Sequence, residues 1–425
     1  MARSGSHNRP HASSPERAEL RFHAIGAAGD GVAEFSGRQV FAPHTAPGDV
    51  AVADIRGDRA EIVSWIERSA QRREPECPHV LQCGGCALQH VGTDAYTVWK
   101  RDRIVSALER VGIEALVGDP IRIAAPTRRR ATFAVRRSQG VADLGFNARR
   151  SSDIARIDEC KVLHPRLLAS LPHLKRIAAS LGAAAFDLSA TLCENGIDVD
   201  AIGPTLAEPA LLASLIEMAR AGRIIRLSID GSPVFTLETP VVTFDGVAAT
   251  PPPGAFLQAS KEGETALIAA VGAPVSGARR VADLFCGIGT FALPLGRAAQ
   301  VDGFDADKLA IGALNAAAGD AQRVGLTIRA KGNARDLFEV PVSAAELNKY
   351  DAVVFDPPRA GARAQVSELA KSRVRLAVGV SCNPETFARD AAILSQGGLK
   401  LTEVTPVDQF VYAPHVELVG VFRRR

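Results

Sequence analysis

DLFCGIGT, at residues 283–290, is the stretch that decides the fold of the C-terminal part of the chain. It ends the apolar segment VADLF, which predicts a strand, and it leads into a helix expected to begin at Thr290. Its glycines, Gly287 and Gly289, allow the backbone to turn tightly and to approach a ligand closely. The pattern therefore indicates a cofactor-binding loop. On its own the G-x-G spacing is a weak signal, since a strand-turn-helix unit often needs glycine only for packing.

Strands and helices alternate from residue 281 to the end of the chain. After the loop we expect strands at VDGFD, LTIRA, YDAVVFD and VRLAVGVS, and helices from Thr290, from Lys308, near Val366 and after Pro384. Such alternation predicts a parallel, doubly wound sheet. The last two segments, LKLTEVTPVDQF and HVELVGVFR, are close enough in sequence to pair as an antiparallel hairpin at the sheet edge.

Polar residues stand where these strands end. Asp305 ends the second strand, Asn333 the third, and Asp356 the fourth, where the sequence is DPPR. In an open parallel sheet these ends meet at one edge, where ligands bind, and a carboxylate at Asp305 can accept hydrogen bonds from ribose hydroxyls. Asp307 could take that role, but we expect it to cap the next helix. The missing third glycine and the lack of a G-K-[ST] motif argue against a nicotinamide site and a phosphate loop.

Cys382 and Glu417 are the candidates for chemistry at this edge. Cys382 ends the fifth strand in VSCNP, a place suited to exposing a thiol, and the next helix could lower the thiol pKa with its N-terminus. Glu417 in HVEL begins the returning strand of the hairpin, which reaches the same edge. A carboxylate in an apolar strand is costly to bury unless it is used or paired; the alternative is a residue that faces solvent. His415 shares a face with Glu417 and could orient a substrate or meet solvent.

The remainder of the chain divides into three parts. Residues 1–18 carry Ser, Pro and charge without the apolar stretch of a secretory signal, and we expect a disordered leader. Residues 19–70 alternate apolar and polar residues in short runs broken by glycine, which predicts a small β-barrel. Residues 71–250 mix helical and strand patterns and predict an α+β domain. The run TPPPG at 250–254 marks a boundary, so the cofactor domain spans residues 251–425.

Seven cysteines in a chain without a secretory signal argue against a disulfide framework. Three lie close together as Cys77-x5-Cys83-x2-Cys86, and Cys160 offers a fourth thiol. Four thiolates suit either a tetrahedral zinc ion or an iron–sulfur cluster, and the spacing alone does not choose between them. Cys193 stands outside this pattern and is expected to be structural.

The charge pattern points to a polyanionic partner. The formal net charge is +3, and the first 150 residues hold an excess of Lys and Arg. Two arginine runs that flank a hairpin-like segment favour phosphate binding over a merely solvated face. Their members are Arg128, Arg129, Arg130, Arg136, Arg137, Arg149 and Arg150. No apolar run is long enough to cross a bilayer, and we expect a cytoplasmic monomer without an obligate protein partner.

The motifs DPPR, SCNP and HVEL, in this order behind the glycine loop, resemble those of the RNA 5-methyluridine methyltransferases, which have the class I fold of S-adenosylmethionine-dependent enzymes. The resemblance implies that Cys382 attacks carbon 6 of uracil and that Glu417 removes the proton from carbon 5. Where this family often has Asn in the glycine loop, the chain has Thr290. The implied cofactor contacts are Gln258, Phe285, Thr290, Asp305, Asn333 and Asp356.

The same resemblance favours a particular branch of the family. Its rRNA-modifying branch carries a 4Fe-4S cluster on C-x5-C-G-G-C and a distant cysteine, whereas its tRNA branch lacks the cluster and the barrel. The resemblance thus implies a cluster on Cys77, Cys83, Cys86 and Cys160, with zinc as the alternative. The barrel resembles a TRAM domain, and the expected substrate is 23S rRNA.

Three other functions are kept as alternatives. One is uridine-5 methylation of tRNA. Another is amino-group methylation, for which D-P-P is a signature, although Arg359 stands where such enzymes place an aromatic residue. The last is a noncatalytic, RNA-binding iron–sulfur protein, which would leave the loop, the thiol and the carboxylate without a purpose.

Overall fold

The structure, a computed structural model, describes residues 15–138, 141–205 and 212–424. Contacts divide the chain into two compact units. The first comprises the residues up to Glu76 together with Ala87–Tyr96, and the second comprises Cys77–Cys86 and Thr97–Arg425. Within the described ranges, no helix combines the length and the apolar character that a bilayer crossing requires.

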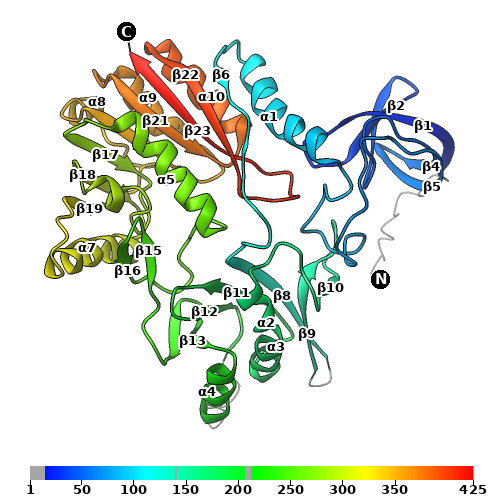
Figure 1. Cartoon of the computed structure of the whole chain (residues 1–425), viewed down its shortest axis with the longest axis horizontal. Coiled ribbons are helices and arrows are strands. Elements are labelled where there is room, and N and C mark those ends of the chain that lie inside the picture. The colour runs from blue at the N-terminus through cyan, green and yellow to red at the C-terminus, as the bar shows by residue number, and fades with distance from the viewer. Residues whose placement is uncertain (1–14, 139–140, 206–211, 425) are drawn as a thin grey trace, which may run out of the picture. The chain divides into compact units, whose positions relative to one another are not determined.

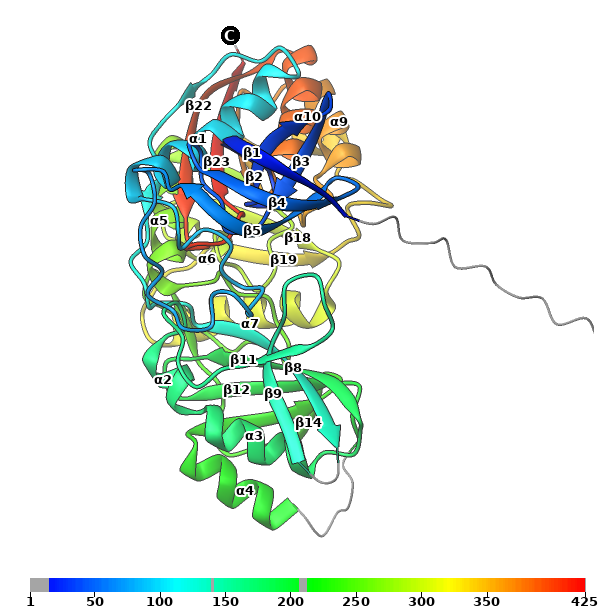
Figure 2. The ribbon, with the colours of Figure 1, turned by 90° about the vertical axis from the view of Figure 1, so that its right-hand side faces the viewer.

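The first unit is built on a closed barrel, which confirms the predicted one (Figure 2). Side chains at alternate positions, such as Leu20 and Phe22, are buried inside it, as the period-two pattern predicts. The barrel begins before residue 19, because the last residues of the expected leader belong to its first strand; residues 1–14 lie outside the described ranges. In barrel order the strands are β1 (Glu16–Ile25), β2 (Gly31–Phe35), β3 (Arg38–Ala42), β5 (Arg59–Glu67) and β4 (Val50–Arg56).

The first part of the second unit is an α+β domain around a mixed seven-stranded sheet (Figure 1). Its strands, in sheet order, are β10 (Ile154–Arg156), β9 (Val141–Asn147), β8 (Arg130–Ser138), β11 (Ala185–Leu192), β12 (Ile197–Ile202), β13 (Ile224–Ile229) and β14 (Ser232–Thr236). The apolar faces of its helices close the core, in which Leu174, Ile177 and Leu215 are fully buried. These helices are α2 (Pro165–Ala169), α3 (Leu171–Ser180) and α4 (Leu212–Ala221). A small hairpin, β15 (Val242–Phe244) and β16 (Val247–Ala249), follows.

The C-terminal part contains the predicted parallel sheet with an antiparallel hairpin. In sheet order its strands are β19 (Ala330–Ala334), β18 (Gln300–Asp305), β17 (Arg280–Leu284), β20 (Ala352–Phe355), β21 (Leu376–Ser381), β23 (Glu417–Arg424) and β22 (Leu399–Asp408). The third strand begins only at Ala330, so the predicted segment LTIRA lies mostly in the loop before it. The hairpin is not at the edge, because β6 (Leu116–Val117) and β7 (Ile121–Arg122) pair with β22 in parallel.

Helices cover both faces of this sheet. Because strand side chains alternate, Val353 and Phe355 face one core while Ala352 and Val354 face the other. The first core is closed by α1 (Thr93–Glu109), α9 (Arg363–Lys371) and α10 (Pro384–Gln396), and the second by α5 (Lys261–Val275) and α7 (Lys308–Arg323). Two short helices, α6 (Ala292–Leu295) and α8 (Ala344–Leu347), complete the part. Asp307 caps α7 by accepting from the backbone N–H groups of Leu309 and Ala310, as predicted.

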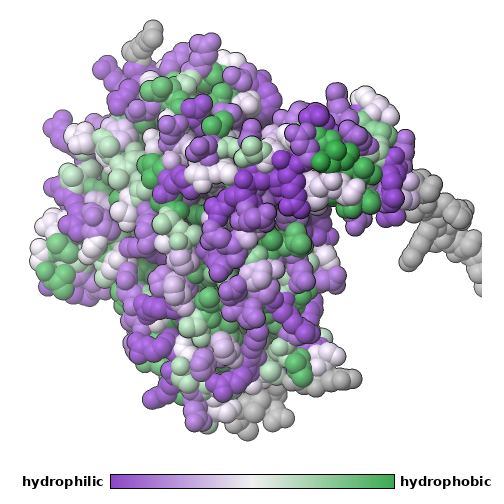
Figure 3. Space-filling model, turned by 45° about the vertical axis from the view of Figure 1, so that its right-hand side comes forward, coloured by the Kyte–Doolittle hydropathy of each residue, from purple (hydrophilic) through white to green (hydrophobic). Residues whose placement is uncertain are grey.

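Apolar residues left on the surface are dispersed. Figure 3 shows hydrophobic residues interspersed among hydrophilic ones over the visible face. Large exposed side chains such as Leu81, Phe256 and Val324 belong to separate elements. Single exposed apolar residues are usual in folded proteins and by themselves identify no binding surface.

Two glycines on adjacent strands bring α10 close to the sheet. Gly379 of β21 and Gly420 of β23 are register partners. A Cβ atom at Gly379 would overlap the ring of Phe355, and one at Gly420 would overlap the ring of Phe387 from α10. The missing side chains therefore make room for these two rings. The space at Gly420 lets Phe387 of α10 pack directly on the sheet, and α10 begins two residues after Cys382.

We expect Gly420→Ala to destabilise the protein by about 1–3 kcal/mol, because overpacking a filled core forces rings or backbone to move. The free energy of unfolding from urea titration measures this. Gly272→Ala is the matched control: it lies in α5 with no atom within 4 Å of an added Cβ. That control should be neutral or stabilising by about 0.5–1 kcal/mol. Equal stability of Gly420→Ala and the wild type would contradict the packing argument.

Candidate functional site

The glycine loop joins β17 to α6 in a backbone conformation that needs glycine. Gly287 and Gly289 have φ of 53° and 99°, and a Cβ at Gly289 would lie 2.9 Å from Leu293. Phe285 also has a positive φ, 62°, which is unusual for a residue with a bulky side chain. The backbone N–H of Gly287 donates to Asp305 Oδ2 at 2.9 Å. The loop and the end of β18 are thus fixed to each other, as the sequence predicted for this edge.

Asp283, the last but one residue of β17, is a polar group that sequence reasoning missed. Its side chain is fully buried, and neither carboxyl oxygen has a partner in ordinary hydrogen-bond geometry. Burial raises its pKa well above the usual range, and the nearby charges of Asp356 and Asp305 raise it further. The backbone N–H of Ala292 is the one group that opposes this shift. Three carboxyl groups therefore interact around the glycine loop.

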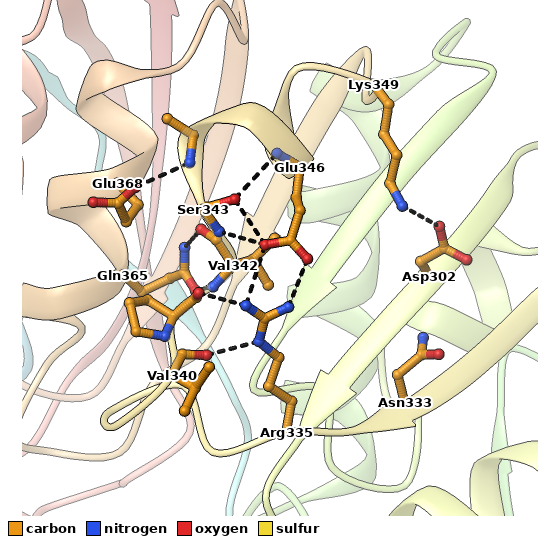
Figure 4. A network of polar contacts seen from close by, with 12 residues as sticks. Asp302, Asn333, Arg335, Val340, Val342, Ser343, Glu346, Lys349, Gln365 and Glu368 are labelled. Carbon is orange, nitrogen blue, oxygen red and sulfur yellow. Dashed lines mark hydrogen bonds and ion pairs between the residues drawn. The ribbon is translucent and has the colours of Figure 1, made fainter.

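A network of polar contacts holds the segment that follows β19 (Figure 4). Arg335 donates to Glu346 at 2.8 and 3.2 Å and to the carbonyls of Val340 and Pro341, both at 2.7 Å. The hydrogen bond from Arg335 lowers the pKa of Glu346 to about 2, so the pair stays charged near neutrality. This network fixes the segment that carries Phe338.

The rings of Phe338 and Phe285 make an aromatic wall at the same place. Their centroids are 5.4 Å apart, and Phe338 remains 45% exposed. Asn333, near the end of β19, donates to the carbonyl of Gly303 at 3.2 Å. Thr290 lies in the turn before α6 and is only partly buried. Phe285, Thr290 and Asn333 were predicted as cofactor contacts, whereas Phe338, which has no motif of its own, was not.

The predicted catalytic residues come together at the carboxyl edge of the sheet. Cys382 follows β21, Asp356 follows β20, and Glu417 begins the antiparallel strand β23. Glu417 is only 4% exposed, so the alternative of a solvent-facing carboxylate is wrong. Burial raises the pKa values of Asp356 and Glu417, and the Asp356 charge adds to the shift at Glu417. Ionisation of one of the two carboxyl groups therefore disfavours ionisation of the other.

Two glutamines connect these carboxyl groups. The Gln409 amide donates to Gln258 Oε1 at 2.6 Å and to Glu417 Oε2 at 3.1 Å, while Gln258 Nε2 lies 3.5 Å from Asp356 Oδ2. The backbone N–H of Ala259 donates to Gln409 Oε1 at 3.0 Å. Gln258 was predicted as a cofactor contact; Gln409 was missed, because its sequence neighbourhood gives no sign of a partner 151 residues away.

The predicted lowering of the Cys382 pKa is wrong. Burial, together with the charges of Glu417 and Asp356, raises the pKa of its thiol to about 11, and only Arg359 opposes this shift. The helix after Cys382 begins with Asn383 as its N-cap, which accepts from the N–H of Glu385. A local sequence pattern shows neither the burial of the thiol nor the two nearby carboxyl groups, and these raise its pKa although a helix follows Cys382.

Positive charges surround the neighbouring His415. Its Nε2 is 3.2 Å from the Arg359 guanidinium. Burial, together with the charges of Arg359, Lys100, Arg103 and Arg128, lowers its pKa to about 4. The imidazole is therefore neutral near pH 7 and sits in a positive field that suits an anionic ligand.

Several members of the predicted arginine cluster make contacts within the protein. Arg129 is buried, forms an ion pair with Glu264 and donates to the Gln258 carbonyl at 3.1 Å, so its assignment to phosphate binding is wrong. Arg130 lies over the ring of Phe256 at 5.5 Å. Arg137 donates to the Leu181 carbonyl. A run of basic residues does not reveal which members face the core.

The four cysteines of the predicted metal site are all partly buried. Burial raises the pKa values of Cys83 and Cys160, and the charge of Cys77 adds to both shifts, so these thiols interact. The backbone N–H of Gly85 donates to Cys83 Sγ at 3.4 Å. Within the described part of the chain, no three His, Cys, Asp or Glu side chains form a group arranged to hold a metal ion. Cys193 is buried, in agreement with a structural role.

Known proteins share both the sequence and the fold. Residues 255–425 match the family described as tRNA (Uracil-5-)-methyltransferase. The chain is 41% identical over 413 residues to an uncharacterized RNA methyltransferase of Brucella suis, covering 97% of this chain and 99% of the relative. It is 32% identical over 444 residues to 23S rRNA (uracil(1939)-C(5))-methyltransferase RlmD of Pseudomonas entomophila, covering 96% and 94%.

A solved structure confirms the predicted fold. The tRNA (uracil-54, C5)-methyltransferase of Pyrococcus abyssi, in complex with S-adenosyl-L-homocysteine, matches 95% of this chain and 99% of its own with a TM-score of 0.73 at 24% identity. The fold is thus that of a known class I methyltransferase architecture. From the relatives that match it along almost its full length, the chain belongs to the family of uracil-5 RNA methyltransferases.

Proposed function

We propose that the protein transfers a methyl group from S-adenosylmethionine to carbon 5 of a uridine in RNA, through a covalent adduct with Cys382. The observation that carries the proposal is the meeting of a thiol, Cys382, and a buried carboxyl group, Glu417, at the sheet edge that also holds the glycine loop. Uracil carbon 5 is too weak a nucleophile to attack a methyl group unaided, and this pair of groups supplies what it lacks.

The glycine loop and its neighbours fit S-adenosylmethionine. The cofactor carries a positive charge near its methyl group, and the buried, unsatisfied carboxyl group of Asp283 lies beside Asp305 and Asp356. When bound, the cofactor supplies an electrophilic methyl group. We assign Asp305 to the ribose, Asn333 and Phe285 to the adenine side, and Asp356 to the methionine end or the target base. Gln258 and Thr290 complete the contacts.

The chain's own residues then act on the uracil ring in order. The Cys382 thiol, beside the Arg359 guanidinium that favours its ionised form, loses its proton to solvent; the resulting thiolate forms a bond to carbon 6 and makes carbon 5 an enolate carbon. After carbon 5 has received the methyl group, the Glu417 carboxylate removes the proton from carbon 5. The electron pair of that bond re-forms the carbon 5–carbon 6 double bond, and the Cys382 thiolate leaves. The Gln409 amide holds Glu417 toward this proton.

The RNA is proposed to be 23S rRNA. Support comes from the match over 94% of a relative named for that substrate, and from the cysteine segment that precedes the cofactor domain. A tRNA substrate is the alternative, since the family matched by residues 255–425 carries that name. Amino-group methylation is disfavoured because Arg359, after the two prolines, bonds to His415 and offers no aromatic face to a base. We propose that the protein acts in the cytoplasm and is a monomer.

We also propose that Cys77, Cys83, Cys86 and Cys160 hold a 4Fe-4S cluster, with zinc as the alternative. All four thiols are partly buried, and those of Cys77, Cys83 and Cys160 interact electrostatically. The N–H of Gly85 already donates to the Cys83 sulfur, as amides around such clusters do. Such a cluster would tie the segment around Cys77 to that around Cys160.

Trapping tests the proposed reaction. Wild-type protein incubated with S-adenosylmethionine and 23S rRNA transcripts containing 5-fluorouridine should form an adduct that survives denaturing electrophoresis, because fluorine at carbon 5 cannot leave as a proton. Cys382→Ala should form none. With ordinary RNA, Glu417→Gln should accumulate a methylated adduct while turnover falls by about 10²–10⁴-fold. Full turnover by Cys382→Ala would contradict the covalent mechanism. Labelling of tRNA alone would show that the substrate is tRNA instead of 23S rRNA.

Metal analysis tests the cysteine site. Protein purified without oxygen should contain iron and acid-labile sulfide in equal amounts near four per chain, the content of a 4Fe-4S cluster. Cys160→Ser should lose most of both. Cys193→Ala, at a buried cysteine outside the group, should retain them. Zinc without sulfide would replace the cluster by the alternative ion.

The buried carboxyl groups make stability depend on pH. Burial raises the pKa values of Asp356 to about 7 and Glu417 to about 8, so the folded chain binds protons that the unfolded chain has lost. Their contribution is complete below the unfolded pKa, about 4, and is lost as pH rises through the folded values. Urea titrations between pH 5 and 8 should therefore show a smaller decline in unfolding free energy for Asp356→Asn than for the wild type.

Asp351→Asn is the control for this pH series. Backbone N–H groups of Arg280 and Arg279 lower the pKa of Asp351, so it is ionised in both states above pH 5 and should not alter the slope. An unchanged slope in Asp356→Asn would show that the carboxyl pair is not proton-linked to folding.

A further inference from the structure

A lysine from a distant helix is buried beneath the site. Lys100 of α1 has a fully buried side chain. Its ammonium group donates to Asp408 Oδ1 at 2.8 Å, to the Phe410 carbonyl at 3.3 Å and to the His415 carbonyl. An ammonium group has three donors, and these three acceptors account for them.

Burying the Lys100 ammonium group costs desolvation free energy. Burial lowers the pKa of Lys100, and Asp408, itself only 2% exposed, opposes that shift. Replacing a buried ion pair by apolar side chains of similar volume is often neutral or stabilising. An apolar side chain could therefore fill the space of Lys100. It could not hold the Asp408 carboxylate and the carbonyls of Phe410 and His415 in one place, because that needs hydrogen-bond donors.

The acceptors lie at both ends of one loop. Residues 409–416 connect β22 to β23, and Lys100 bonds at Asp408 and Phe410 on one side and at His415 on the other. Arg103, one turn further along α1, donates to the carbonyl of Pro414. The same helix thus fixes the beginning and the end of this loop, more than 300 residues away in sequence.

This loop carries the residues that orient the proposed base. Gln409 at its start donates to Glu417 and to Gln258, and His415 near its end pairs with Arg359 beside Cys382. We propose that Lys100 is a positioning residue for the reaction, which holds the 409–416 loop so that Glu417 and His415 face the adduct formed on Cys382. This inference rests on the proposed function.

Loss of the Lys100 contacts should affect one step of the reaction more than the others. If the loop shifts, Gln409 no longer holds Glu417, and removal of the carbon 5 proton should slow more than attack by Cys382. The affected intermediate is the methylated adduct, which should accumulate. A displacement of about 1 Å at a reacting group can cost about 10²-fold in rate.

The test combines Lys100→Ala with chemical rescue. Turnover number should fall by about 10–100-fold with KM for RNA changed little, and methylated adduct on ordinary RNA should accumulate. Propylammonium or butylammonium ions, which can fill the space and donate to Asp408, should restore turnover in a saturable way. Tetramethylammonium, which has no N–H group, should not. Lys100→Met fills the space without donors and should be impaired and insensitive to amines.

Arg226→Met is the matched control. Arg226 forms a buried, bidentate pair with Asp198 at 2.7 and 2.6 Å in the central sheet, away from the loop. It should lose stability, while its folded fraction keeps the wild-type turnover number and accumulates no adduct. If the folded fractions of both Lys100 variants turn over like wild type, the positioning role is overturned. The same holds if turnover falls without adduct accumulation and without amine rescue.

The wild-type reaction separates this outcome from failure of the proposed function. Wild type that forms the 5-fluorouridine adduct establishes the reaction, so that normal turnover in the Lys100 variants counts against positioning alone. Wild type that forms no adduct removes the function on which the inference rests. Thermal unfolding of each variant, followed by circular dichroism, fixes the folded fraction used in every comparison.

Discussion

The burial of two carboxyl groups at one sheet edge is the constraint on which the site depends. Asp356 and Glu417 repel each other in a poorly solvated place, and each must be held by neighbours that tolerate either protonation state. Amides do this well, since a glutamine can donate through nitrogen or accept through oxygen without changing its charge. The Gln258–Gln409 pair meets that need. Gln409 directly follows β22 and Glu417 begins β23, so these two strands must keep their register for the contact to persist.

Much of this architecture follows from local sequence. Parallel strands have short apolar runs, their ends carry polar residues, and a barrel strand alternates, so the cofactor domain and the barrel were both predictable. The exceptions have physical reasons. LTIRA has a strand composition, but the chain enters the sheet only at Ala330, where β18 offers a parallel partner. The short strands before the central domain pair with β22, and no local pattern reports so distant a partner.

The sequence predicts those residues of the candidate site whose chemical type suggests a role. It does not predict the residues that are singled out only by their position in the fold. Cys382 and Glu417 were found because a thiol and a carboxylate are conspicuous at strand ends. Gln409 and Lys100 were not, since a glutamine and a lysine are ordinary until the fold buries them. The pKa of Cys382 was misjudged for the same reason: a helix terminus can be read locally, but a charge from another strand cannot.

The short strands that extend the last sheet also constrain synthesis of the chain. Residues 116–122 leave the ribosome long before β22, which begins at Leu399, becomes available to pair with them. Until then their backbone groups, and the buried face of α1 above them, lack the surface that will cover them. The cofactor domain can therefore close only after nearly the whole chain has been made, and the early segments must stay unaggregated through that interval. Closure of the cofactor domain is thus a long-range event, whereas the barrel is built from strands that are close together in sequence.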